Sequence, residues 1–425
     1  MTSKLPTYSD YKASGIDWLG DIPSHWECVK SQYIFSLASG ETINGEDFSK
    51  GGLYPVYGGN GIRGYHDKYN LEGKHILIGR VGALCGNIHI TPEKSWVSEH
   101  ALIATPLKQV NLHWLSSLLE TMKLGQYSMA SAQPVIAASN VGKLHIPIPP
   151  IYEQKVIAAY LDDVTGKVDA LIAEKRKQVE DIRAYRTSLI TETVTHGLNP
   201  DAPLRPSGID WLGNIPSHWK QCKLKHCAEL VLGKMLQTQK PSSGDYSLEK
   251  YLKSRNVSSL SLSGLNNLDE MWFSDYEKCL YLLKEGDIVM NEGGEIGKVA
   301  RWIPQSFDCY IQNSVHKITP NEALNSGYLE YYLFTIANIG YFNSIVSQIS
   351  IAHLTKEKLS NTPVMVPPLA EQQSIADFLD AKIAKIDELI SELTKQIDEL
   401  TEYKQAVITE AVTGKVDVRD YKPSN

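Results

Sequence analysis

The stretch SGIDWLGDIPSHW (residues 14–26) returns with a single change as SGIDWLGNIPSHW (residues 207–219), 207 − 14 = 193 residues later. A second repeat begins at Pro149 as PPIYEQKVIAAYLDDVTGKVDALI and at Pro367 as PPLAEQQSIADFLDAKIAKIDELI, with an offset of 367 − 149 = 218 residues. The chain is therefore an internal duplication. Its two intervening segments differ in length by 218 − 193 = 25 residues.

Each copy of the second repeat predicts a long helix that starts after a proline pair. Apolar residues at heptad spacing are Ile157, Leu161, Val164, Val168, Leu171, Ile182, Tyr185 and Leu189 in the first helix, with Lys175 and Gln178 as polar interruptions. In the second helix they are Ile375, Leu379, Ile386, Leu389, Leu393, Leu400, Tyr403 and Val407, and Gln396 stands in the same rows as the counterpart of Gln178. A helix over residues 151–195 is roughly 67 Å long, too long to be explained by packing on one small core. We expect an antiparallel coiled coil, and two unrelated surface helices are the alternative.

The repeats follow one another in a circular order. The first helix ends in LITETVTHGLNP and leads into the second SGIDWLG copy, whereas the second helix ends in VITEAVTGKVDV close to the last residue. We therefore expect the tip of the second helix to lie beside the N-terminal copy and to complete its unit. The repeats' tryptophans are predicted to be packing anchors, with a binding role as the alternative; they are Trp18, Trp26, Trp211 and Trp219.

Composition indicates a globular protein of two to three domains. The 425 residues carry a net charge of −7, no apolar run long enough for a membrane span, and no apolar signal core at the N-terminus. We expect a soluble, cytoplasmic protein that has no membrane partner. The segments 27–148 (10 Lys/Arg, 9 Asp/Glu) and 220–366 (15 and 15) are balanced, whereas 367–425 (7 and 12) is acidic. This distribution predicts modest nonspecific affinity for phosphate backbones.

The two segments between the repeats are cognate but diverged. KHILIGRVGALCGNIHI in the first and GDIVMNEGGEIGKVARW in the second both indicate strand, glycine turn and strand, and WVSEHALIATP is echoed by YIQNSVHKITP. Their other loop sequences disagree. The predicted fold is α+β, with boundaries at 1–148 (lead-in segment and first domain), 149–206 (central helix), 207–366 (repeated lead-in segment and second domain) and 367–425 (C-terminal helix).

Searches for catalytic motifs in the sequence fail. GGEIGK (293–298) lacks the first glycine and the final hydroxyl residue of a phosphate loop, and no His-Glu-x-x-His spacing for zinc occurs. An amino-methyltransferase needs Asn or Asp before Pro-Pro-aromatic, whereas Ile148 and Val366 precede the two proline pairs here. We expect a non-catalytic protein without a bound metal or cofactor.

In its whole length the chain resembles a specificity (S) subunit of a Type I restriction-modification system. The resemblance is carried by the doubled I-P-x-x-W, the doubled P-P-x-x-E-Q, the helices ending in I-T-E-x-V-T, and the two diverged segments. It implies two target recognition domains of α/β type that each read one half of a bipartite site in double-stranded DNA, joined by two long antiparallel coiled-coil helices in a pseudo-two-fold circular repeat. It also implies two modification (methyltransferase) subunits and restriction subunits as partners, with S-adenosylmethionine, ATP and Mg on those partners.

The resemblance places the strand-turn elements 79–87 and 291–301 near DNA. Arg and Asn side chains make bidentate contacts to guanine and adenine edges, so polar residues of these and neighbouring loops are the candidates. The DNA-binding candidates are Asn60, Arg63, Tyr65, Arg80, His100 and Gln133 in the first domain, and Arg255, Asn256, Lys298, Arg301, Asn313 and Gln348 in the second. The residues expected to form the coiled coil and dock partners are Leu161, Val168, Gln178, Ile182, Leu189, Leu379, Ile386, Leu393, Gln396, Leu400 and Val407.

A competing hypothesis is a coiled-coil scaffold or anti-restriction regulator whose domains bind proteins. A mimic of DNA would concentrate acidic residues on the two domains, and these balance instead. A stand-alone enzyme with an unrecognised site is the third alternative.

Overall fold

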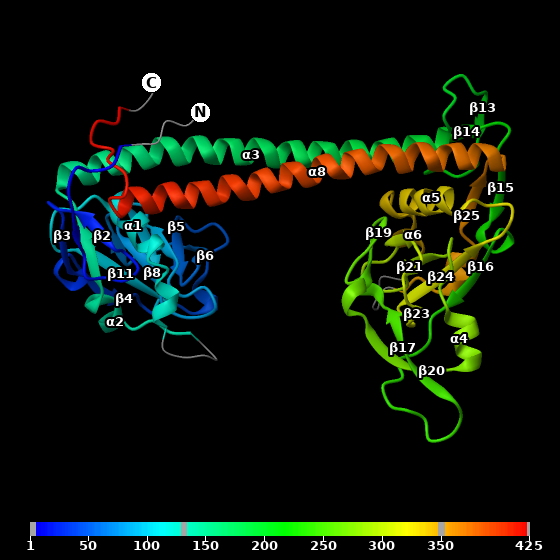
Figure 1. Ribbon diagram of the computed structural model, residues 1–425, viewed down its shortest axis with the longest axis horizontal. Helices are drawn as coiled ribbons and strands as arrows, with labels where there is room; N and C mark the ends of the chain where they lie inside the picture. The colour runs from blue at the N-terminus through cyan, green and yellow to red at the C-terminus, as the bar shows by residue number, and fades with distance from the viewer. Residues whose placement is uncertain (1–5, 129–133, 347–352, 423–425) are drawn as a thin grey trace. The chain divides into compact units, whose positions relative to one another are not determined.

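A computed structural model describes residues 6–128, 134–346 and 353–422, and the chain divides into two compact units. Unit 1 contains residues 1–176 and 394–425, and unit 2 contains residues 177–393. The division passes through both long helices, α3 (Ile151–His196) and α8 (Leu369–Val412), so each unit holds one domain and a part of each helix (Figure 1). Unit 1 therefore combines both ends of the chain, as the circular order predicts.

Domain 1 contains two four-stranded sheets. The first sheet has the order β4 (Phe35–Ser39), β11 (Ala101–Pro106), β8 (Ile76–Gly79), β9 (Ile88–Ile90). The second has the order β6 (Gly61–His66), β5 (Tyr54–Gly58), β10 (Lys94–Val97), β7 (Leu71–Glu72). All four residues of β8 are buried, which its unbroken apolar run predicts for a central strand.

Domain 2 repeats this plan with other loops. Its first sheet has the order β16 (Ala228–Leu232), β24 (Val315–Pro320), β21 (Ile288–Asn291), β22 (Val299–Arg301). Its second has the order β20 (Asp269–Ser274), β17 (Tyr246–Leu252), β23 (Tyr310–Ile311). In both domains one strand pair of the second sheet is parallel, β10 with β5 and β23 with β17. The two domains thus share one scaffold.

Short hairpins and helices complete the two units. The remaining strand pairs are β1 (Tyr11–Ala13) with β2 (Asp21–Pro23), β3 (Glu27–Lys30) with β12 (His145–Ile148), β13 (Leu204–Pro206) with β14 (Asn214–Pro216), β15 (Lys220–Lys223) with β25 (Pro363–Val366), and β18 (Val257–Ser258) with β19 (Ser261–Leu262). The other helices are α1 (Leu112–Thr121), α2 (Ala138–Lys143), α4 (Asp275–Tyr281), α5 (Ser326–Asn338), α6 (Tyr341–Ile345) and α7 (Lys356–Ser360). The 3-10 turns are η1 (Ser31–Tyr33), η2 (Gly45–Asp47), η3 (Leu124–Tyr127), η4 (Leu224–His226), η5 (Ser254–Asn256) and η6 (Leu265–Asn267).

The glutamate of P-P-x-x-E-Q joins the lead-in segment to the long helix. In unit 1 the Glu153 carboxylate accepts hydrogen bonds from Trp26 Nε1 at 2.9 Å and Tyr8 Oη at 3.1 Å, and it lies 2.6 Å from His25 Nε2. In unit 2 the Glu371 carboxylate accepts from Trp219 Nε1 at 3.1 Å and lies 2.8 Å from His218 Nε2. The two sequence repeats are therefore the two halves of one joint, which holds each domain against its helix.

The glutamine of the same motif fixes the helix that covers each domain. Gln154 accepts a hydrogen bond from the Asn111 backbone N–H at 2.9 Å and donates to the Pro149 carbonyl. Gln372 accepts from the Asn325 N–H at 2.7 Å and donates to the Pro367 carbonyl. Asn111 and Asn325 are the N-caps of α1 and α5, so one side chain satisfies backbone groups of two elements.

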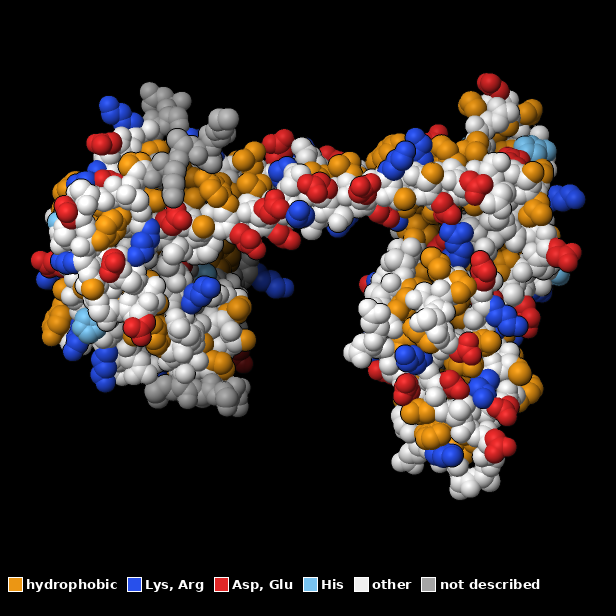
Figure 2. Space-filling view, in the orientation of Figure 1, with side chains coloured by type: hydrophobic (Ala, Val, Ile, Leu, Met, Phe, Trp, Pro, Cys, Tyr) orange, Lys and Arg blue, Asp and Glu red, His pale blue; other side chains and the backbone are white. Residues whose placement is uncertain are grey.

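The two long helices run antiparallel. In unit 1 Asp169 of α3 pairs with Lys404 of α8 at 2.7 Å, and Lys175 donates to Gln396 at 2.6 Å. In unit 2 Arg186 pairs with Asp387 at 2.8 Å. The pairs Asp169–Lys404 and Arg186–Asp387 are equivalent under the offset of 218, since 387 − 169 and 404 − 186 both equal 218. Figure 2 shows Asp and Glu side chains interspersed with Lys and Arg along the visible face of these helices.

The helix seam differs in part from the predicted heptad rows. Leu161 and Val168 are buried as predicted, as are Leu379, Leu393 and Val407, while Ile182, Leu189, Ile386, Gln396 and Leu400 are partly buried. The predicted seam residues Leu171 and Tyr185 are instead 46% and 59% exposed. Gln178 is also exposed, and Ile172 and Val179 take the buried positions. In α8 Leu389 and Tyr403 are likewise exposed. The cause in both helices is that a straight helix has 3.6 residues per turn, so its buried stripe drifts from a strict heptad row.

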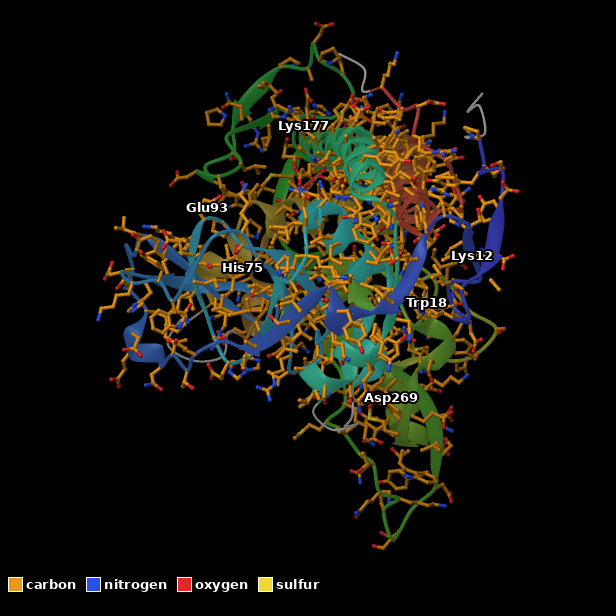
Figure 3. The ribbon with its side chains drawn as sticks, turned by 90° about the vertical axis from the view of Figure 1, so that its left-hand side faces the viewer. Lys12, Trp18, His75, Glu93, Lys177 and Asp269 are labelled. Atoms are coloured by element: carbon orange, nitrogen blue, oxygen red, sulfur yellow. The ribbon has the colours of Figure 1, made fainter. Side chains whose placement is uncertain are left out.

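The end of the chain closes unit 1. Lys415 Nζ donates to the Leu19 carbonyl at 2.8 Å, and the Asp417 N–H donates to the Pro6 carbonyl at 2.7 Å. Of the four tryptophans in the two lead-in repeats, Trp26 and Trp219 are buried anchors, whereas Trp18 is 38% exposed on the lead-in segment (Figure 3). Trp211 is partly buried and lies 5.3 Å from the Tyr341 ring. Among the described helices, none has the length and apolar content that crossing a membrane requires.

Candidate nucleic-acid interface

Three segments of domain 1 meet at the end of its central strand. Arg80 directly follows β8, and its N–H donates to the His100 carbonyl at 2.9 Å. The Arg80 carbonyl accepts from the Ile136 N–H at 2.8 Å, while Val81 and Val135 form an antiparallel bridge. The backbone at Arg80 is therefore held on both sides by chain segments far away in the sequence.

Domain 2 builds the same frame from different residues. The Glu292 N–H, which follows β21, donates to the Ser314 carbonyl at 2.9 Å, and the Glu292 carbonyl accepts from the Leu354 N–H at 2.7 Å. Gly293 and His353 form the corresponding bridge. We call these two arrangements the reading frames of domains 1 and 2, defined by Arg80, His100 and Ile136 and by Glu292, Ser314 and Leu354.

The domain 1 reading frame borders a hollow of about 380 Å³ that three of the predicted DNA-binding residues line. Its lining is Gly59, Asn60, Ile62, Arg63, Val81 and His100. The β5–β6 turn closes on the end of β8 so tightly that a Cβ on Gly79 would lie 2.0 Å from the Gly59 carbonyl oxygen. Only glycine fits there, and this close approach brings Asn60 and Arg63 beside His100.

The polar groups around this hollow are positioned by weak, exposed contacts. Arg80 Nη1 donates to Ser39 Oγ at 3.1 Å, and Asn60 accepts from Asn87 Nδ2 at 2.7 Å. The Arg63 guanidinium lies 5.9 Å from the centre of the Phe48 ring, and His100 Nε2 is 3.4 Å from a Glu99 oxygen. The structure thus brings three of the candidates, Asn60, Arg63 and His100, together around one hollow.

Tyr65 stands on β6, the strand that also carries Ile62 and Arg63 of this hollow. Tyr65 is 48% exposed and Ile62 is 53% exposed. His89 lies behind the β5–β6 turn, where burial lowers the pKa of its imidazole and so favours the neutral ring. An aromatic and apolar rim with Arg side chains is a surface that suits base edges and phosphates together.

The candidates of domain 2 divide into two groups. Arg255 lies 3.2 Å from Asp269 and is exposed, Lys298 pairs with Glu295, and Asn313 accepts from Gln312 Nε2 next to Ser314. Arg255, Lys298 and Asn313 are thus at or near the domain surface. The second group consists of Asn256 and Arg301, which have structural partners.

Asn256 and Arg301 are engaged by neighbouring groups of the protein. Asn256 is 5% exposed, accepts from the Lys253 N–H and donates to the Ser263 carbonyl, so it shapes the turn η5. Arg301 points to the long helix, where it lies 2.9 Å from Asp380 and 3.4 Å from Glu330. Both residues therefore have structural partners in this chain, and their contact with DNA stays a prediction. Gln133 and Gln348 lie outside the described residues.

Burial shifts the pKa of two groups in domain 2, Glu330 beside Arg301 and His316 beside Leu354. Glu330 is 5% exposed, and burial raises the pKa of its carboxyl to about 7 although Arg301 opposes the shift. His316 is fully buried and contacts the Leu354 carbonyl at 2.6 Å, and burial lowers the pKa of its ring. A neutral His316 donates to the Leu354 carbonyl, and the N–H of the same Leu354 donates to Glu292, so His316 helps to hold the domain 2 reading frame.

Sequence reasoning did not select Glu292, His353 or His316 as candidates. His353 Nδ1 lies 2.7 Å from the Glu292 carboxylate, and the imidazole is 53% exposed. The available signal was the echo between SEHALI and QNSVHK, which sets His100 against Ser314 at an offset of 214. At that offset Arg80 would be set against Gly294, so this echo indicates the region but not Glu292 itself.

Comparison with known families matches most of the chain. The sequence model of the family described as Type I restriction modification DNA specificity domain matches residues 23–181 and 216–399. The chain is 24% identical over 356 residues to the Type I restriction enzyme MjaVIII specificity subunit of Methanocaldococcus jannaschii, covering 81% of the chain and 77% of that protein. It is 24% identical over 369 residues to a putative specificity subunit, S.HindORF215P, of Haemophilus influenzae, covering 83% and 85%.

A shorter match and a solved structure complete the comparison. The chain is 42% identical to the EcoprrI specificity subunit of Escherichia coli over 110 residues, which are 26% of the chain and only 27% of that relative. A solved chain from work on complex assembly and conformational transition of the type I R-M system superposes with a TM-score of 0.67 at 16% identity, covering 92% of this chain and 98% of the other. At that identity the superposition bears on the fold alone.

Proposed function

Because the chain belongs to the Type I restriction-modification DNA specificity family, we propose that it is the DNA-recognition subunit of a Type I restriction-modification complex. Each domain reads one half of an asymmetric, split site in double-stranded DNA. The observation that carries the proposal is that both domains hold the same reading frame with different side chains in it. Two readers of unlike half-sites require this combination.

The coiled-coil helices act in this proposal as a spacer between the half-sites and as the docking surface for two modification (methyltransferase) subunits. The support is that the joint occurs in both units and that the interhelical ion pair is repeated at an offset of 218 residues. Two similar surfaces suit two copies of one partner. Restriction subunits then bind through this assembly.

The methyl transfer and the cleavage belong to the partners in this proposal. S-adenosylmethionine is bound by the modification subunits, and ATP and Mg by the restriction subunits, while this chain is non-catalytic. The support is the sequence, which has neither the phosphate-loop spacing nor the Asn or Asp before Pro-Pro that amino-methyl transfer needs.

The experiment is sequence-resolved methylation mapping of DNA from cells that carry this chain with its modification subunit. Matched cells lack only this chain. We expect a split motif with an unspecific gap to be methylated only when the chain is present. Unchanged methylation despite formation of the complex would refute the proposal and favour the scaffold or anti-restriction hypothesis.

A further inference from the structure

The first position after the central strand is equivalent in the two domains. Arg80 follows β8 and Glu292 follows β21, and each backbone N–H and C=O makes the same two hydrogen bonds to equivalent segments. The following residues form equivalent bridges, Val81 with Val135 and Gly293 with His353. Because two hydrogen bonds and the adjacent bridge fix the backbone in each domain, the two side chains leave a common scaffold from the same place.

The side chains at this position have opposite charge. In domain 1 Arg80 is partly exposed, and its Nη1 donates to the exposed Ser39 hydroxyl; the next residue, Val81, lines the hollow together with Arg63 and His100. The side chains of Asn60, Arg63 and His100, which line this hollow, can all donate hydrogen bonds. In the major groove guanine presents two acceptors, O6 and N7, which match the fork of an arginine.

The equivalent place in domain 2 is an acceptor. The Glu292 carboxylate is 14% exposed, and its Oε2 lies 2.7 Å from His353 Nδ1, which holds the carboxylate at the rim of the reading frame. A carboxylate has two oxygens and can accept several hydrogen bonds, so the His353 contact leaves further capacity. Exocyclic amines of cytosine (N4) and adenine (N6) are the donors that a carboxylate can accept from in the major groove.

We propose that this position determines specificity in both half-sites: Arg80 selects a guanine in the half-site read by domain 1, and Glu292 selects an amine-bearing base, cytosine or adenine, in the half-site read by domain 2. His353 is a positioning residue for Glu292. The inference rests on the proposed function and adds the chemistry of one base in each half-site.

The first test uses the complex of the full chain with its modification subunit on a DNA library in which every position of both half-sites is randomised. Sequencing the methylated fraction gives the preference at each position. For Arg80→Ala we expect the guanine preference at one position of one half-site to fall by about 5- to 150-fold, the range for one bidentate contact. Arg80→Lys keeps the charge without the fork and should recover only part of this preference.

The second test changes the acceptor in domain 2. Glu292→Gln keeps the size of the side chain, and an amide pairs with adenine N6 and N7. If the native base is cytosine, Glu292→Gln should move the preference at one position of the other half-site toward adenine. If the native base is adenine, Glu292→Gln should retain the adenine preference, whereas Glu292→Ala should lose it. His353→Ala should weaken the preference at the same position only.

The matched controls lie at the opposite ends of the same two strands. Lys74 and Glu285 are exposed and precede β8 and β21. Lys74→Ala and Glu285→Gln therefore remove a charge before the start of each strand, away from the reading frame at its other end. Both should leave the motif unchanged.

The outcomes separate this inference from the function on which it rests. No chain-dependent motif with the unsubstituted chain would contradict the proposed function itself. A chain-dependent motif that Arg80→Ala and Glu292→Ala leave unchanged, or that either variant loosens in both half-sites, would overturn the inference alone.

Discussion

Replacing Glu153 by alanine should destabilise unit 1 more than replacing Glu371 by alanine destabilises unit 2. The two carboxylates hold equivalent joints but have different numbers of buried donors. Glu153 is fully buried and accepts from Trp26 Nε1 and Tyr8 Oη, whose residues are 0% and 4% exposed. Burial and the nearby carboxylate raise the pKa of the Tyr8 phenol, so this group remains a donor at neutral pH.

The magnitude follows from the donors that each substitution leaves without a partner. An unsatisfied buried donor costs about 1–3 kcal/mol, so Glu153→Ala, with two such donors, should cost about 4 kcal/mol. Glu371 accepts from one buried donor, Trp219 Nε1, and its other partner His218 is 45% exposed. Glu371→Ala should therefore cost about 2 kcal/mol.

The assay must report the two units separately. Urea titration with hydrogen exchange read peptide by peptide gives a midpoint for unit 1 from peptides of β3 and for unit 2 from peptides of β15. Glu153→Gln and Glu371→Gln, which keep one acceptor oxygen, are the matched controls and should cost less. Equal losses for the two alanine variants, or a larger loss in unit 2, would refute this account of the joint.

Two further outcomes are expected. Burial raises the pKa of Glu330 from 4.5 to about 7. Between these values the folded chain holds a proton that the unfolded chain has released, so rising pH lowers the free energy of unfolding. In urea titrations at pH 5 and 8, Glu330→Gln should remove up to about 3 kcal/mol of this loss, and a difference in stability between variant and unsubstituted chain that is the same at both pH values would contradict the assignment. Truncation after Gly414 removes the hydrogen bonds of Lys415 and Asp417 to the lead-in segment. It should lower the stability of unit 1 by about 2 kcal/mol while unit 2 keeps its urea midpoint. An equal loss in both units would show that the residues after Gly414 do not stabilise unit 1 specifically.

The sequence predicted the architecture because duplication repeats both the pattern and its physical causes. Prolines before Ile151 and Leu369 start the long helices, as expected, because proline fixes φ and needs no amide donor at a helix start. The circular order correctly placed the chain end beside the first lead-in segment. The heptad rows failed at Leu171 and Tyr185, and at Leu389 and Tyr403, because the buried stripe of a straight helix drifts from a strict heptad row.

The candidate interface was predictable only in part. Glycine turns and polar loops indicated the segments around Asn60, Arg63 and His100, and these residues meet at one hollow. Arg301 looked equally suitable, yet its guanidinium pairs with Asp380 of the long helix, 79 residues away in the sequence. Such pairing depends on tertiary contacts that no local pattern encodes.

What the sequence by itself determined is the family, the duplicated scaffold and the two long helices, because repeats and heptads are linear features whose physical meaning is local. What only the tertiary structure decided is which side chains occupy equivalent places in the two domains. Arg80 and Glu292 lie in segments of different wording, and their equivalence follows from backbone hydrogen bonds to His100 and Ser314. Those bonds form between segments distant in the chain, so the fold alone brings the opposite charges to the same position.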